Sequence, residues 1–267
     1  MLCYGVYNDE WLVLKVQENI PKVKSLYKAL CLLDYFDSDH PERGIKELSD
    51  LSGMLKSSVY NVVSTFQMCG FIEKNNSSGK YKLGKKILTL SNVLYSTDPT
   101  KAIIKPYMDK IAEECLETVY LAFPSGTEII YVEGSYPPGV LYARSIVGVK
   151  AKMYCTGIGK AILAYSDEEL VQSVVDQGLE AFTSFTLSDE KALREDLEKT
   201  RQRGYSIDNM EHEYGIRCIG VPLHNSSGHL LGALSISGPS LRVMDDKVAF
   251  FAEKLQEATN EIKTLLK

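Results

Sequence analysis

The segment from residue 45 to residue 83 constrains the fold most, because its spacing predicts two short helices, a tight turn between them and a hairpin after them. The first helix has apolar residues on one face, namely Ile45, Leu48 and Leu51. Gly53 follows, where a sharp turn needs a residue that tolerates a positive φ. This order indicates a helix-turn-helix.

The second helix, from Ser57 to Met68, has one apolar and one polar face, and Ser57 can cap its first turn. Its apolar stripe has the spacing i, i+3, i+4, i+7 and consists of Val59, Val62, Val63 and Phe66. Compact hydrogen-bonding side chains on the other face can enter a DNA groove and reach phosphates and base edges. We expect these to be Lys56, Ser57, Ser58, Tyr60, Asn61 and Ser64.

Gly70 ends the second helix, and a hairpin is expected after it. Phe71 and Ile72 begin one strand, residues 73–79 form a polar turn, and residues 80–83 form the other strand. A helix-turn-helix followed by a hairpin is a winged helix. The lysines of this wing are expected to hold phosphates and its polar tip to lie at the DNA, through Lys74, Asn75, Asn76, Ser77, Lys80 and Lys82.

An alternative is that these helices and the hairpin form a protein-interaction module with a merely solvated polar face. The distribution of charge favours DNA. Residues 22–91 carry a net charge of +4, residues 92–267 carry −7, and the whole chain carries −5. An acidic chain that gathers positive charge on one small unit suits a protein that offers only this unit to double-stranded DNA.

Length and composition set wider limits. At 267 residues and 45% hydrophobic content the chain can form about two domains, each with its own core. No apolar run approaches a membrane span, and Asp9 and Glu10 stand where a signal peptide would be positively charged. Six cysteines without paired spacing are typical of reduced core thiols: Cys3, Cys31, Cys69, Cys115, Cys155 and Cys218. We therefore expect a cytoplasmic protein that does not act at a membrane.

Four regions are predicted: an N-terminal extension (1–21), a winged helix-turn-helix domain (22–91), a linker (92–103) and a second domain (104–267). The winged helix should open with a helix from Lys24 to Asp37 whose inward residues are Leu26, Leu30, Leu33 and Phe36. A helix beginning near Gly84 and another from Lys105 to Glu117 should connect the domains, interrupted by Pro99 and Pro106.

In the second domain, strand and helix patterns alternate. Strands are expected at residues 119–123, 128–133, 140–143, 206–208, 216–223 and 230–237, and helices at 157–165, 167–177, 189–203 and 245–266. Asn225 to Gly228 joins the last two strands as a hairpin. The fold class is therefore α+β, a mainly antiparallel sheet flanked by helices, of the kind found in small-molecule sensors.

Several motifs, in this order, carry a family resemblance. After the winged helix come Tyr154 to Ala161 (YCTGIGKA), Arg203 to His212 (RGYSIDNMEH), Gly215 to Ile219 (GIRCI) and Ser235 to Pro239 (SISGP). Nearly the whole chain from residue 22 resembles the isocitrate-lyase-regulator (IclR) family of transcriptional regulators. The resemblance implies a GAF-like C-terminal domain that binds a small effector, and a homodimer or dimer of dimers.

The resemblance places effector contacts at Thr156, Gly157, Ile158, Asp208, Cys218, Ser235 and Ser237. The residues are compatible with such a pocket, because the glycine-rich segment opens a helix whose free amides suit a carboxylate. Ser235 and Ser237 share one face of a strand by its period of two. Each residue alone also has a structural interpretation, such as close packing for Gly157 or a turn for Asp208. The expected effector is a small organic or aromatic acid, and the sequence does not choose between them.

Two other classes of function are open to this sequence. A metal sensor could use Cys155, His212 and Cys218, and a cysteine-dependent enzyme could use one of these thiols with His212. Neither spacing is a recognised ligand or catalytic pattern. We therefore expect no catalysis and no cofactor. The expected function is transcriptional regulation on a near-palindromic operator, and the resemblance implies repression as the family's commoner role. The apolar stripe Ile87, Leu88, Leu90, Val93 and Leu94 is expected at a dimer contact.

Overall fold

The computed structural model describes residues 21–37, 39–97, 99–139 and 146–266. The chain divides into two compact units, Met1–Thr97 and Asp98–Lys267, and the division falls inside the linker predicted for residues 92–103. The strand predicted for residues 140–143 lies outside the described residues, as does the N-terminal extension apart from Pro21.

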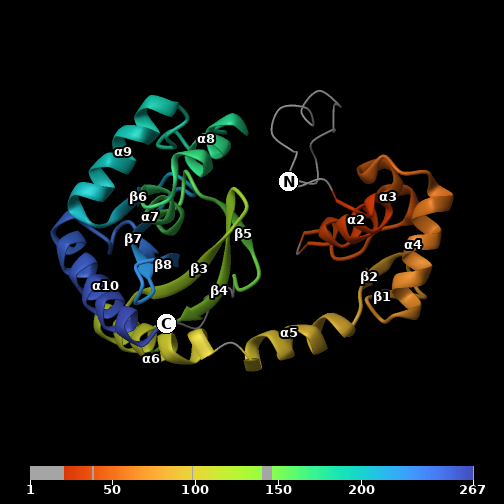
Figure 1. Ribbon diagram of the computed structural model, residues 1–267, viewed down its shortest axis with the longest axis horizontal. Coiled ribbons are helices and arrows are strands. Elements are labelled where there is room, and N and C mark those ends of the chain that lie inside the picture. Colours follow the sequence, from red (N-terminus) through yellow and green to blue (C-terminus); the bar gives the residue numbers. More distant parts are fainter. Residues whose placement is uncertain (1–20, 38, 98, 140–145, 267) are drawn as a thin grey trace. The chain divides into compact units, whose positions relative to one another are not determined.

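The N-terminal unit is a winged helix-turn-helix (Figure 1). Its elements are α2 (Lys24–Cys31), the 3-10 helix η1 (Leu32–Tyr35), α3 (Ile45–Ser52), α4 (Lys56–Met68), β1 (Ile72–Lys74), β2 (Tyr81–Leu83) and α5 (Lys86–Thr97). The strands β1 and β2 pair antiparallel as the wing. One small core joins the helices to the wing and includes Leu32, Tyr35, Leu48, Val59, Val63, Ile72 and Tyr81.

The turn between α3 and α4 confirms the role expected of Gly53, which ends α3 in the left-handed region at φ 68°. The expected cap of the next helix is wrong. Leu55 stands at the N-cap of α4, no side chain of the described residues caps the helix, and Ser57 lies within the first turn. The helix begins one residue earlier than predicted, and Ser57 is exposed.

The stripe expected on the first helix is also wrong in part. Leu26 and Leu30 are 55% and 50% exposed, whereas Leu32 and Tyr35 are buried. The prediction assumed one regular α-helix through Asp37, but α2 ends at Cys31 and the chain continues as the tighter η1. Because a 3-10 helix has about three residues per turn, the face that meets the core changes.

The C-terminal unit is α+β, as predicted. A six-stranded antiparallel sheet has the order β5-β4-β3-β8-β7-β6. The strands are β3 (Thr118–Ser125), β4 (Glu128–Ser135), β5 (Lys150–Lys152), β6 (Ser206–Asn209), β7 (Ile216–His224) and β8 (Leu230–Pro239). The helices are α6 (Pro99–Cys115), α7 (Gly157–Ala164), α8 (Glu168–Asp176), α9 (Glu190–Arg203) and α10 (Asp245–Leu265). The short edge strand β5 was not predicted, because its three residues carry no alternation.

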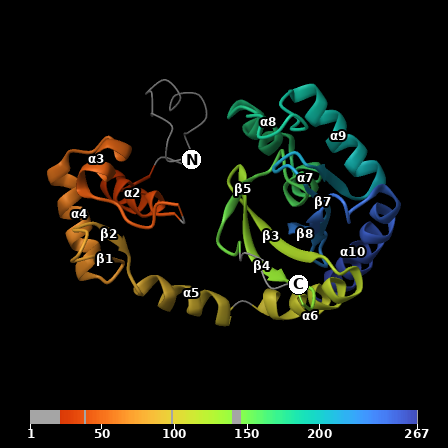
Figure 2. The same ribbon diagram turned by 180° about the vertical axis from the view of Figure 1, so that it is seen from behind.

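Each face of the sheet has its own core. Alternate residues such as Val119 and Leu121 of β3 pack with α6 and α10. Ala122 and Ala233 belong to the core of the other face, which α7 covers together with Leu193 and Leu197 of α9. Figures 1 and 2 show α8 and α9 beyond α7 on this side. The two faces therefore offer separate environments for a site.

Pro106 does not interrupt the connecting helix. It lies inside α6, which begins at Pro99, six residues before the predicted start. Pro99 fits the first helical position, where no backbone N–H is needed. Ile104 and Met108 on either side of Pro106 are fully buried against the sheet, and this burial outweighs the lost hydrogen bond.

Candidate functional site

The polar face of α4 can enter a DNA groove, because the opposite face packs into the core through the fully buried Val59 and Val63. Tyr60 is 55% exposed. The expected contact residues divide into the exposed Lys56, Ser57, Tyr60 and Asn61 and the half-buried Ser58 and Ser64. Sequence reasoning stopped at Ser64 and missed Met68, which is 89% exposed on the same face. Continuing the helical period from Asn61 and Ser64 would have found it.

The wing is held to the rest of its unit by two carboxylates. The Asn75 side-chain amide donates to Glu42 at 2.6 Å, and Ser78 donates to the same carboxylate at 2.7 Å. Lys80 forms an ion pair with Glu47, with 3.0 Å between Nζ and Oε1. Asn75 also accepts the backbone N–H of Ser77. The side chains of Asn75 and Lys80 thus shape the wing, and Asn76 and Ser77 remain exposed at its tip.

Three of the expected phosphate contacts are exposed cations without an ion pair to another described residue: Lys56, Lys74 and Lys82. Lys74 lies over the ring of Tyr81, 5.7 Å from its centroid. Hydrogen bonds from Asn75 and Ser78 lower the pKa of Glu42, which stays ionised close to Lys82. The positive charge of the wing is therefore partly balanced by acidic neighbours, and Lys74 and Lys82 are the better placed for phosphate.

In the C-terminal unit, the register of the sheet aligns the expected effector residues in two rows. Asp208 is opposite Cys218, and Cys218 is opposite Ser237. Ser235 lies in the next row, between Gly220 and Tyr120. The thiol of Cys218 donates to the Ser237 hydroxyl at 3.2 Å. Two serines of β8 and one residue each of β6 and β7 thus meet on the sheet face that α7 covers.

The N-terminus of α7 packs onto the same rows. Thr156 caps the helix by accepting the amide of Gly159 at 3.2 Å, and its hydroxyl donates to the carbonyl of Lys152. A Cβ on Gly157 would lie 3.0 Å from Cβ of Cys218, so glycine permits this close approach. The side chain of Ile158 is buried in the core. The backbone amides of Gly157 and Ile158, rather than these side chains, remain for an anion.

The acid of this set is deeply buried. Asp208 is 2% exposed, and its Oδ1 accepts the backbone N–H of Glu211 at 2.7 Å. Burial raises the pKa of Asp208 to about 7. Desolvation, and then the Asp208 carboxylate, raise the pKa of the Cys218 thiol well above its ordinary value. Near pH 7 the thiol of this row is therefore protonated and Asp208 is partly protonated.

Sequence reasoning missed a cluster of tyrosines beside these rows. The ring of Tyr120 lies 5.4 Å from that of Tyr131 and 6.3 Å from that of Tyr136. Burial and the neighbouring Cys218 and Asp208 raise the pKa of Tyr131 far above its ordinary value, so its phenol stays protonated. The Tyr136 hydroxyl is buried and has no hydrogen-bond partner among the described residues. Tyr120 could have been found, because it pairs with Ser235 on the expected strand face.

Only two of the three residues of the alternative Cys/His site, Cys155 and His212, form a close contact with each other. Cys155 Sγ and His212 Nδ1 are 3.7 Å apart, while Cys218 bonds to Ser237 instead. Among the described residues no group of three or more His, Cys, Asp and Glu side chains could hold a metal ion. Burial raises the pKa of Cys155 far above its ordinary value, so the thiol is not poised as a thiolate nucleophile.

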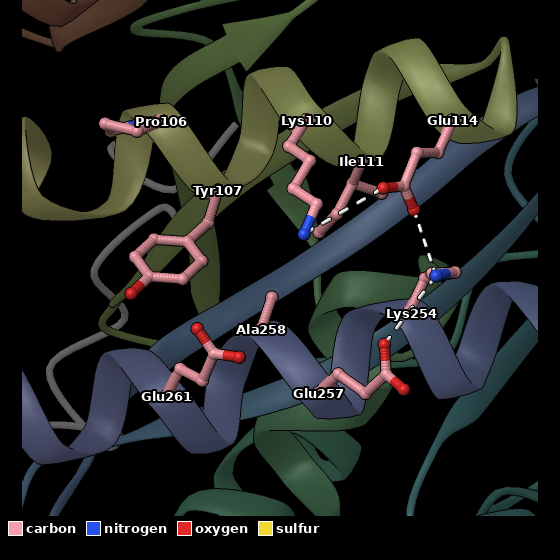
Figure 3. Close-up of a pocket in the computed structure, with 9 residues that line it drawn as sticks. All are labelled: Pro106, Tyr107, Lys110, Ile111, Glu114, Lys254, Glu257, Ala258 and Glu261. Carbon is pink, nitrogen blue, oxygen red and sulfur yellow. Dashed lines mark ion pairs between the residues drawn. The ribbon is translucent and has the colours of Figure 1, made fainter.

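A separate groove of about 230 Å³ lies between α6 and α10, on the outer side of the other core (Figure 3). Its lining is dominated by charged residues that pair with one another. Lys254 lies 3.0 Å from Glu114 and 3.7 Å from Glu257, and Lys110 lies 4.0 Å from Glu114. None of the residues expected to contact an effector lines this groove.

Known proteins match both units. The family model described as the bacterial transcriptional regulator IclR C-terminal domain matches residues 93–264, and the IclR helix-turn-helix domain matches residues 25–76. The chain belongs to the IclR family. It is a DNA-binding transcriptional regulator with a C-terminal effector-binding domain. No described helix is long and apolar enough to cross a membrane.

Relatives and solved structures agree over almost the full length. The chain is 31% identical to the HTH-type transcriptional regulator XynR of Escherichia coli over 90% of this chain and 95% of that protein. It is 31% identical to the transcriptional repressor IclR of the same species, over 90% and 89%. A crystal structure of a putative IclR regulator from a Silicibacter species has a TM-score of 0.81 at 27% identity, covering 90% of this chain and 94% of that chain.

Proposed function

We propose that the protein is a repressor that binds a near-palindromic operator as a homodimer, or as a dimer of dimers, and that a small organic acid modulates this binding. The observation that carries the proposal is the pairing of an exposed polar recognition face on α4 with a buried polar row on the α7 face of the sheet. Repressors among the relatives, such as the acetate operon repressor of Salmonella typhimurium, support the direction of regulation.

The α4 helix reads bases in the major groove and the wing contacts the backbone. Base contacts come from the exposed face of the helix, above all Tyr60 and Asn61, with Ser57, Ser58 and Ser64 beside them. Lys56, Lys74 and Lys82 hold phosphates, because their ammonium groups are exposed. Lys80 contributes less, since Glu47 neutralises it. Asn75 orders the wing tip that presents Asn76 and Ser77.

The effector binds on the α7 face of the sheet, beside the N-terminus of α7. Its carboxylate is held by the amides of Gly157 and Ile158 at the positive end of α7, beside the Thr156 cap. Asp208, Cys218, Ser235 and Ser237 meet its other polar atoms. An IclR homologue from Microbacterium hydrocarbonoxydans was solved with 4-hydroxybenzoate. At 22% identity and a TM-score of 0.74, that homologue shares the fold of this chain. The aromatic rings of Tyr120 and Tyr131 are compatible with a bound aromatic acid.

Dimerisation is supported by exposed apolar side chains on α5. Leu88, Val93 and Leu94 are 70%, 53% and 65% exposed, and Leu90 is 46% exposed. An isolated winged helix contacts too little DNA for strong specificity, and a second copy supplies the other half-site. Covering these leucines and Val93 in a dimer would remove an unfavourable apolar surface.

The testing experiment selects operator sequences from random DNA with the full-length protein and then titrates the best sequence with and without a pool of small acids. We expect an inverted repeat, protection of two half-sites, and a changed affinity when an acid binds. A selected site without symmetry, or a monomer in light scattering at micromolar concentration, would contradict the homodimer. Action on chromosomal DNA places the protein in the cytoplasm.

A further inference from the structure

A group of four charged side chains, two of them buried and two half-buried, lies beside the row that contains Asp208 and Cys218. Lys160 of α7 is fully buried, and its ammonium lies 2.8 Å from Asp196 of α9 and 2.5 Å from Glu211 in the turn after β6. Arg203 lies 3.6 Å from the other oxygen of Asp196. Two cations thus face two carboxylates. Their charges cancel, so Lys160 does not neutralise a further carboxylate.

Asp208 is that further acid. It sits three residues before Glu211, is 2% exposed, and forms no ion pair with any described cation. From its own turn it accepts only the Glu211 amide. Ionisation of Asp208 would therefore add a third buried carboxylate to a group that holds two cations. A buried charge without its own partner is strongly disfavoured.

Groups on the surrounding elements do not supply the missing charge. The thiols of Cys218 on β7 and Cys155 before α7 are protonated, and so is the phenol of Tyr131 on β4. His212, on the same turn, is exposed, but its desolvated side lowers its pKa, so it is mainly neutral at pH 7. Lys160 is the nearby cation, and it is matched by Glu211 and Asp196.

We propose that Asp208 carries a proton when the effector is bound and that it shares this proton with the carboxylate of the effector. This inference rests on the proposed effector site. An ionised Asp208 would repel an anion placed at the α7 N-terminus, whereas the neutral acid donates a hydrogen bond to it. The site thereby accepts a carboxylate together with one proton, and it disfavours an amide or a cation in the same place.

Burial agrees with this assignment, because it raises the pKa of Asp208 to about 7. A bound anion favours the protonated form still more. Binding therefore takes up a proton wherever free Asp208 is ionised. Above pH 7 the affinity for a carboxylate should fall, approaching about tenfold per pH unit, since one pKa unit corresponds to a tenfold change in an equilibrium constant. Below about pH 6 the affinity should be nearly constant.

Infrared spectroscopy of the full chain without ligand tests the protonation directly. At about pH 6, wild type and the control Glu213→Gln, which removes an exposed carboxylate from the same turn, should show a protonated-carboxyl C=O band that Asp208→Asn lacks. In both of these proteins the band should fade as the pH rises through about 7. The same spectrum in wild type and Asp208→Asn, or a wild-type band unchanged between about pH 5 and pH 9, would overturn the proposal. The wild-type titration keeps the test valid if Asp208→Asn does not fold.

A thermal-shift comparison tests the ligand class. A pool of small aliphatic and aromatic monocarboxylates, including 4-hydroxybenzoate, should stabilise the chain more at about pH 6 than at about pH 8.5, and the matching primary amides should not. Equal stabilisation by acids and amides, or no stabilisation by acids, would overturn the proposal that Asp208 and the effector share a proton. Operator titration separates the two proposals: intact DNA binding with a failed acid arm removes the effector chemistry but leaves the DNA-binding function standing.

Discussion

The polar face of α4 and the polar rows of the sheet contain similar side chains, mostly hydroxyls with an amide or an acid, but they differ in their contact with water. Tyr60 and Asn61 are exposed, whereas Asp208 and Ser235 are each 2% exposed. Exposed donors and acceptors are satisfied by water before they meet DNA, so each can be changed at small cost to the fold. Buried ones depend on fixed partners and on charge balance.

The two sites should therefore respond differently to substitution. A change on α4 should alter DNA affinity while the stability of the fold remains, because water replaces the lost contact. A change in Lys160 or in its carboxylate partners should alter three properties together: the stability of the fold, the pKa of Asp208 and the response to the ligand. Lys160 and Asp208 test the buried side of this comparison, and Asn61 and Lys82 test the exposed side.

The largest effect is expected from Lys160→Met, which leaves Asp196 and Glu211 without their buried partner. Removing one member of a buried ion pair costs about 3–5 kcal/mol. Urea denaturation of the full chain should show this loss in the C-terminal transition. The matched control Lys191→Met removes an 84% exposed lysine and should change stability by less than about 0.5 kcal/mol. Equal losses in both variants would refute the distinction between buried and exposed charge.

The next effect is a dependence of stability on pH that Asp208→Asn removes. The pKa of Asp208 is raised by burial to about 7 from a model-compound value of 3.8, so the folded state holds this proton more tightly than the unfolded chain. Its stabilising contribution is complete below about pH 4 and is lost as the pH rises to about 7. The free energy of unfolding of wild type, relative to the variant, should fall by about 1.4 kcal/mol per pH unit between about pH 5 and pH 7. A flat difference between the two proteins across this range would contradict the raised pKa.

On the exposed side, Asn61→Ala should reduce discrimination between DNA sequences by about 1–3 kcal/mol if Asn61 makes a bidentate base contact. Stability should change little, because Asn61 is exposed. Competition titrations with single-base variants of the selected operator measure the effect. If Asn61→Ala lowers affinity for every sequence by the same factor, Asn61 positions the helix and does not read a base.

The sequence predicted the helix-turn-helix, the wing and the α+β class because each rests on local periodicity and on glycines such as Gly53. It mispredicted the first helix, because the change from α2 to the tighter η1 depends on which residues the core accepts. The burial of Leu32 and the exposure of Leu26 are determined by tertiary packing, which local periodicity does not show. Pro106 misled in the same way, since a local rule for proline was overridden by packing on the sheet.

In the candidate sites, the sequence likewise indicated the residues that belong to local motifs but not the distant residues that pair with them. Asp208, Cys218 and Ser237 were selected from motifs, and the strand register aligns them. The partners that set their chemistry could not be selected. Lys160 and Glu211 are 51 residues apart in the chain, and Lys80 and Glu47 are 33 apart. Neither pairing has a local pattern, because helix and strand periodicity relate only near neighbours.

The smallest effect compares two lysines of the wing. Lys82→Ala should weaken binding to all DNA sequences alike and reduce the steepness of its salt dependence by about one counterion, because its ammonium is exposed and unpaired among the described residues. Lys80→Ala should act in the same direction but more weakly, since Glu47 already neutralises Lys80. The double variant Lys80→Ala with Glu47→Gln should recover part of the affinity lost in Lys80→Ala, because it removes a negative charge beside the phosphates. Salt-dependent fluorescence anisotropy on the selected operator measures all three variants. A larger loss for Lys80→Ala than for Lys82→Ala would mean that Lys80 leaves Glu47 for a phosphate when DNA binds.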